Sequence, residues 1–191
     1  MRKLLFPIIT LVLTLSMILL MVIPAMAVGP TITTILDGPT QVGISDEVDN
    51  EWTITITICP DDVYNLDEVV VQGGIGADLV IKEVNGFPVS YPMLKKTEQV
   101  VGDVTLAKRG GKMGATIVKW DIGTLESDGC LTLVLLVGTG NNPQEKLEFT
   151  SAELGHELDG GFSATYWYEG IEYETPETEP LTVDVVGLEE E

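Results

Sequence analysis

The strongest constraint on the fold is an alternation of apolar and polar residues with a period of two. The clearest example runs from Trp52 to Ile58, where Trp and Ile fill one set of alternate positions and threonines the other. Because successive side chains of a strand point to opposite faces, this segment predicts a strand with one buried and one wet face. Three further rows predict the same: Val118, Trp120 and Ile122; Leu131, Leu133, Leu135 and Val137; and Leu181, Val183 and Val185.

Shorter strands are predicted between these rows, whereas helical periodicity is almost absent after Val28. A Gly110-Gly111 turn predicts a hairpin between 104–106 and 116–118. About nine or ten short strands predict an all-β, antiparallel sandwich over residues 28–186, followed by an acidic tail at 187–191. The shorter candidates are 31–36, 68–72, 79–84, 99–107, 146–151, 162–168 and a brief strand at 171–173.

The first 27 residues predict export. Arg2 and Lys3 precede an apolar run over 4–24, and Ala25-Met26-Ala27 supplies small residues two apart, so cleavage is expected after Ala27. The run is also about 20 residues long, the length of a membrane-spanning helix, so an uncleaved anchor is the alternative. In that case 4–24 would be the only membrane contact. Both alternatives place the rest of the chain outside the cytoplasm, extracellular or at the cell surface.

The chain is strongly acidic. It has 30 Asp and Glu against 10 Lys and Arg, a formal charge of −20, and it becomes more acidic if Arg2 and Lys3 leave with the signal. Phosphate backbones and anionic lipid would repel such a surface, which excludes nucleic acid as an expected partner.

One stretch resembles a known family. Trp120-Asp121-Ile122-Gly123-Thr124-Leu125, then Gly129 and the Leu131–Val137 strand, resembles the conserved-repeat module of prokaryotic cell-surface proteins. The 52–58 and 181–185 strands look like the early and closing strands of that module. The resemblance implies an immunoglobulin-like sandwich with a structural or adhesive role. The chain departs from the pattern at Cys59-Pro60, in a longer segment over 77–111, and in having one copy.

The two cysteines form the first candidate site. Cys59 continues the polar row of the first strand, and Cys130 shares the polar row of the strand that contains Thr132. The immunoglobulin-like resemblance implies that these strands pair side by side and antiparallel. A Cys59–Cys130 bridge is then expected on the outer face, with Thr57 opposite Thr132 and Thr55 opposite Val134. Free thiols and an intermolecular bridge remain open.

The acids form the second candidate site. One cluster spans 46–51, and another contains Asp61, Asp62, Asp67 and Glu68. Carboxylates are suitable ligands for calcium, so Asp61 and Asp62 are the candidate metal ligands. The competing interpretation is a set of solvated loop acids, because the first cluster lacks the Gly and distal Glu of a calcium-loop signature. No other cofactor is expected.

Nothing in the sequence favours catalysis. His156 is the only histidine and has no second His at a zinc-protease spacing, so it is expected to be an isolated surface residue. Tyr166 and Tyr168 should face one way and Trp167 the other, which favours core packing over a carbohydrate platform.

The sequence therefore predicts a non-catalytic, exported structural or adhesion module. Its expected partner is a cell-surface molecule or another copy of itself. One alternative is a filament subunit, in which residues 28–36 add as a strand to the open edge of a neighbour. The other is a calcium-dependent or glycan-binding module.

Overall fold

The computed structural model describes residues 29–44, 50–61, 64–89, 98–108, 115–139, 141–142, 145–146, 149 and 152–187. The signal or anchor at 1–27 and the tail beyond Gly187 lie outside this range. Every regular element within it is a strand: β1 (Thr31–Asp37), β2 (Gln41–Gly43), β3 (Glu51–Cys59), β4 (Leu66–Ile75), β5 (Val80–Val84), β6 (Phe87–Pro88), β7 (Glu98–Val101), β8 (Val104–Lys108), β9 (Thr116–Leu125), β10 (Leu131–Gly138), β11 (Asn141–Asn142), β12 (Glu145–Lys146), β13 (Glu153–Glu157), β14 (Asp159–Tyr168), β15 (Ile171–Glu174) and β16 (Thr182–Val186).

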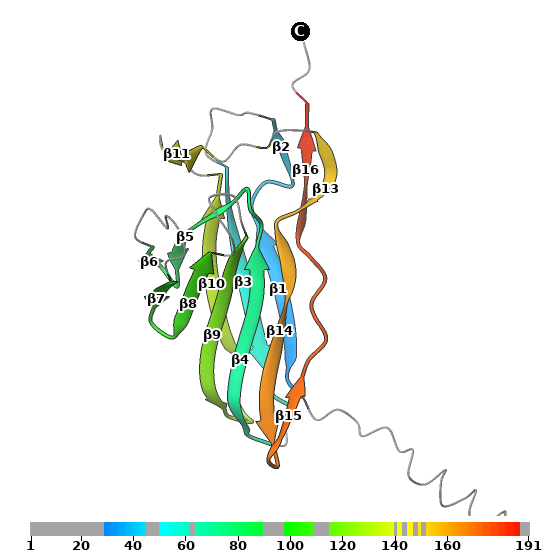
Figure 1. The fold of residues 1–191 in the computed structure, drawn as a ribbon. Helices are drawn as coiled ribbons and strands as arrows, with labels where there is room; N and C mark the ends of the chain where they lie inside the picture. The colour runs from blue at the N-terminus through cyan, green and yellow to red at the C-terminus, as the bar shows by residue number, and fades with distance from the viewer. Residues whose placement is uncertain are drawn as a thin grey trace, which may run out of the picture.

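Two sheets pack face to face as a sandwich (Figure 1). One has five strands in the order β1-β3-β10-β5-β6, and the other has six in the order β15-β14-β4-β9-β8-β7. All neighbouring strands in both sheets are antiparallel. The all-β, antiparallel class predicted from the two-residue period is therefore confirmed.

The core lies between these sheets and is built from the predicted inward rows. Trp52, Ile54, Ile56 and Ile58 alternate with half-buried threonines along β3, and all four are buried. They pack with the inward rows of the other strands in one cluster of buried apolar residues. Such burial excludes water from each apolar side chain and contributes about 1.5–3 kcal/mol per large residue.

One residue of these rows was placed wrongly by the alternation. Leu131 was expected to point into the core, but 41% of it is exposed. It is the first residue of β10 and follows the exposed residues 128–130, so it lies at the edge of the sandwich where the core does not yet cover it. Leu133 and Leu135, further along the strand, are fully buried as predicted.

Two predicted strands differ in the structure. The 99–107 segment is a hairpin, because Gly102 turns the chain with φ of 63° and sets Val101 opposite Val104. The pairing of β8 with β9 is as predicted, and the expected turn at Gly110-Gly111 lies outside the described residues. Of the predicted strand at 146–151, the structure describes only Lys146, at the end of β12, and the buried Phe149.

A third, smaller sheet lies at one end of the sandwich, where β16 pairs with β13 and, in parallel, with β2 (Figure 1). Sequence reasoning predicted β16 but not β13 or β2. Both are irregular or short: β13 contains a register shift between Glu153 and His156, and β2 has three residues.

Candidate functional site

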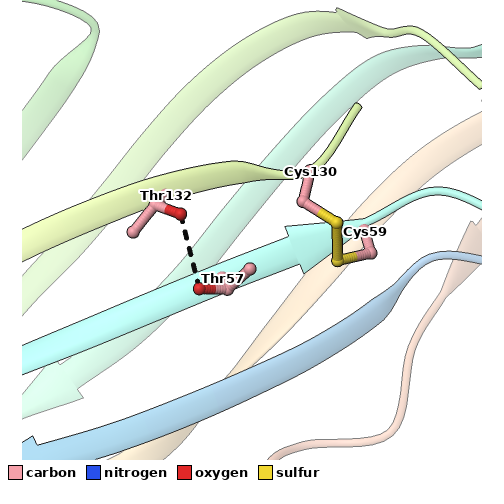
Figure 2. The surroundings of a disulfide bond; sticks show 4 residues. All are labelled: Thr57, Cys59, Cys130 and Thr132. Atoms are coloured by element: carbon pink, nitrogen blue, oxygen red, sulfur yellow. Dashed lines mark hydrogen bonds between the residues drawn. A yellow bond between two sulfur atoms is a disulfide. The ribbon is translucent and has the colours of Figure 1, made fainter. Parts of the chain in front are cut away.

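The disulfide joins the end of β3 to the residue that precedes β10. Cys59 and Cys130 are bonded with an S–S distance of 2.06 Å (Figure 2). The register of the two strands sets Thr57 opposite Thr132 and Thr55 opposite Val134, as the sequence predicted. Thr57 and Thr132 also approach one another through their hydroxyls at 3.4 Å, two residue pairs along the strands from the disulfide (Figure 2). The predicted Cys59–Cys130 bridge is thus present in the structure.

An uncharged surface extends from this disulfide across three strands of the five-stranded sheet. Its residues alternate with buried or half-buried neighbours and therefore point away from the core. They carry no ionisable side chain, although the chain has 30 acids. Asp37 and the Lys82–Glu51 ion pair, at 2.7 Å, lie beyond its far end. We call this surface the threonine face; its residues are Thr31, Thr33, Ile35, Thr53, Thr55, Thr57, Thr132 and Val134.

The six-stranded sheet has one edge closed by a segment that is not a strand. Residues 175–181, here called the strap, run beside β14 between β15 and β16 (Figure 1). Thr175 exchanges two hydrogen bonds with Ala164, one through its N–H and one through its Oγ1, both 2.9 Å. Thr178 does the same with Phe162, at 2.9 and 3.0 Å. The two threonine hydroxyls thus accept from N–H groups that would otherwise lie open at the sheet edge.

Asp159 binds the end of the strap through a backbone hydrogen bond. Its Oδ1 accepts from the N–H of Leu181 at 3.0 Å and of Gly161 at 3.1 Å, whereas its Oδ2 is buried without a hydrogen-bond partner. Burial raises the pKa of Asp159 above its ordinary value of 3.8, against the lowering effect of the two N–H donors. The strap and Asp159 were not predicted; the threonines three apart and the prolines at 176 and 180 are the only sequence signal.

An open groove of about 550 Å³ lies beside Asp159. Its lining includes Gln72, Ser163 and glycines of β4, and also four acids, Asp159, Glu157, Glu174 and Glu177. These carboxylates do not converge. Among the residues that the structure describes, no group of three or more His, Cys, Asp or Glu side chains is arranged to hold a metal ion.

Of the two predicted calcium ligands, the structure describes only one. Asp61 is half-buried after β3, and Asp62 lies outside the described residues. Most of the first acid cluster, Asp46 to Asp49, is also outside, and Glu51 pairs with Lys82. Calcium binding by Asp61 and Asp62 stays a prediction, which calorimetry with and without a chelator would test.

His156 is not the isolated surface residue that was expected. Its Nδ1 lies 2.9 Å from Glu153, its Nε2 lies 3.5 Å from Asp78, and its ring meets that of Phe149 edge-on at 4.9 Å. The sequence analysis missed this because it considered His156 alone, whereas Asp78 comes from a distant segment and Glu153 and Phe149 from the residues just before it. The imidazole therefore lies between two carboxylates and against one aromatic ring.

The aromatic residues near the end of β14 follow the predicted alternation. Tyr166 is buried and Trp167 is 37% exposed. Tyr166 stacks on Tyr173 of the edge strand β15 with 5.6 Å between ring centroids, and Tyr168 contacts Tyr64 at 5.1 Å. The rings therefore pack mainly on one another, as core packing with an edge tyrosine predicted.

The part of the chain that the structure describes contains no helix long and apolar enough to cross a bilayer. The apolar run at 4–24 is outside that part, so the choice between signal and anchor stays a prediction.

No family model matches the chain, and neither does any curated protein. The conserved-repeat resemblance therefore remains a prediction. Several solved structures do resemble the fold of this chain. The major pilin subunit of Bacillus cereus gives a TM-score of 0.41 at 16% identity, over 83% of this chain and 40% of that one. A C-terminal fragment of the major pilin of Streptococcus agalactiae gives 0.43 at 9% identity, over 82% and 55%.

An exo-β-N-acetylglucosaminidase of Vibrio harveyi gives a TM-score of 0.39 at 9% identity, over 81% of this chain and 18% of that one. This chain thus spans between 18% and 55% of the length of these three proteins. Because the TM-scores are all below 0.5, these likenesses carry no argument about what the chain does.

Proposed function

We propose that this chain is a non-catalytic, exported structural or adhesion module of the cell surface, an immunoglobulin-like sandwich of the conserved-repeat type. The observation that carries the proposal is the disulfide between Cys59 and Cys130 on the outer face of the five-stranded sheet. Disulfides persist in oxidising compartments and are rare in the cytosol. The bridge therefore agrees with the export that Arg2, Lys3 and the apolar run predict.

The module would act as a rigid scaffold that presents its surfaces. The disulfide ties two central strands together, the strap closes one sheet edge, and the core is continuous between the sheets. Partner specificity would then come from exposed surfaces supported by this framework. The partner expected at those surfaces is another cell-surface molecule or a second copy of the chain.

Export is tested by expressing the full chain in a prokaryotic host and fractionating the cells beside a cytoplasmic marker enzyme. The proposal expects the protein in the extracytoplasmic or surface fraction, with Val28 as its first residue if the signal is cleaved. A protein found only with the cytoplasmic marker, with both cysteines free, would overturn the proposal.

A second candidate function is a filament subunit that assembles by strand addition. The observation in its favour is the β-prone segment Thr31–Leu36 at the edge of a sheet. In the structure this segment pairs over its whole length with β3 of the same chain, so addition to a neighbour would require β1 to be exchanged between chains. Electron microscopy of the purified mature protein tests this: polymers support it and their absence opposes it.

A further inference from the structure

The edges of the sheets differ in how they are protected. Unpaired N–H and C=O groups along an edge form a template for another strand, so edges are usually kept short, charged or covered. Here β14 is covered by the strap, while β7 and β15 have four residues each and carry glutamates. β6 and β2 have two and three residues, and β13 has a glutamate at each end.

β1 has none of these protections. It is a regular seven-residue strand, and within the described part of the chain it pairs only with β3, on one side. Its one charged residue is Asp37, at its end, and its exposed positions include Ile35, of which 61% is accessible. An apolar residue this exposed on a long, regular edge is the combination that favours pairing with another strand.

The negative charge of the chain limits which surfaces of two copies can approach one another. A second copy of this chain brings another formal charge of −20, so most approaches between two copies bring acids together. The β1 strand avoids this, because six of its seven residues are uncharged and the threonine face beside it carries no ionisable side chain. Along β1 itself, two copies can therefore meet without placing acid against acid.

We propose that two copies of this chain pair antiparallel through β1, edge to edge, about a two-fold axis at Thr34. Antiparallel pairing about that residue sets Thr33 opposite Ile35 of the partner subunit and Ile32 opposite Leu36 of the partner subunit. Ile32 and Leu36 are only half-buried in the single chain, so the pairing buries more of both. Asp37 meets Thr31 of the partner subunit, not a second acid. The five-stranded sheets of the two copies become one continuous sheet.

This inference does not depend on the proposed export, and it can fail while export holds. It also differs from the filament model, in which β1 is exchanged between chains. Here each β1 stays paired with β3 of its own chain, and the two-fold contact joins only two copies. Edge pairing therefore gives a dimer, whereas strand exchange in an open chain gives polymers.

The test is sedimentation of the purified protein over a wide concentration series, with two matched lysine variants. Ile35→Lys places a charge on the free edge. Thr132→Lys places the same charge on the same face of the central strand β10, away from the edge. Both variants make the chain less acidic by one charge, so a loss of dimer in only one of them cannot come from net charge. Circular dichroism and thermal unfolding check that each variant folds.

The wild type and Thr132→Lys are expected to be dimers, and Ile35→Lys is expected to raise the dimer Kd by more than about tenfold. Amide exchange of β1 residues should slow as wild-type protein concentration rises. A wild type that stays monomeric at every concentration would overturn the proposal. So would polymers, or a dimer that both lysine variants weaken equally.

Discussion

Removal of the disulfide is a perturbation whose effect on stability can be calculated from the structure. The bridge closes a loop with a sequence separation of 71. In the chain-entropy model, a cross-link of this length restricts the unfolded chain enough to stabilise the fold by about 4 kcal/mol at 25 °C. Cys130 is exposed and Cys59 half-buried, so replacing both with alanine leaves no cavity in the core to add to that cost.

The assay is urea unfolding of the wild type and of the Cys59→Ala, Cys130→Ala double variant. With a slope of about 2 kcal/mol per M, a loss of about 4 kcal/mol lowers the midpoint by about 2 M. Reduced wild type should unfold near the double variant. The matched control is Thr57→Ala with Thr132→Ala, two residue pairs from the bridge, which removes one exposed hydroxyl contact and should cost no more than about 1.5 kcal/mol. If oxidised wild type and the double cysteine variant unfold at the same midpoint, the entropic reasoning is wrong.

Three further predictions concern the core, the strap and Asp159. Leu133→Ala should lower the free energy of unfolding by about 2–5 kcal/mol, measured by urea unfolding, because Leu133 is fully buried. Thr175→Val and Thr178→Val each remove an acceptor from a β14 N–H and should each cost about 1–3 kcal/mol; an unchanged midpoint would mean that the strap hydrogen bonds do not hold this edge. Because burial raises the pKa of Asp159 in the folded state, the folded chain binds that proton more tightly than the unfolded chain does. Its contribution to stability therefore falls as pH rises from the unfolded pKa through the folded one. Asp159→Asn should become more stable relative to wild type over that interval, and parallel pH profiles of the two proteins would contradict this.

The strands with strict alternation could be predicted from the sequence because one face must be buried. The row Ile54, Ile56 and Ile58 has one register that hides it and another that exposes it, so its placement is determined locally. The same parity argument, joined to the family resemblance, placed Cys59 beside Cys130 and Thr57 opposite Thr132.

The remaining features depend on contacts between distant segments. Thr175 and Thr178 accept hydrogen bonds from β14 only because the sandwich brings the strap alongside that strand. His156 gains Asp78 as a neighbour in the same way. Leu131 follows the apolar alternation but lies at the first residue of its strand, a boundary that periodicity does not locate. Local sequence patterns therefore predicted the core and the disulfide, and missed the strap and the neighbours of His156, which depend on contacts between separate segments.

We propose that this sandwich works in an oxidising compartment, where the Cys59–Cys130 disulfide stabilises it. The most direct measurement traps free thiols with an alkylating reagent as the host cells are lysed and then maps unreduced peptides by mass spectrometry. The account predicts the peptide that contains Cys59 joined to the one that contains Cys130. Recovery of both peptides separately, each alkylated without prior reduction, would contradict it.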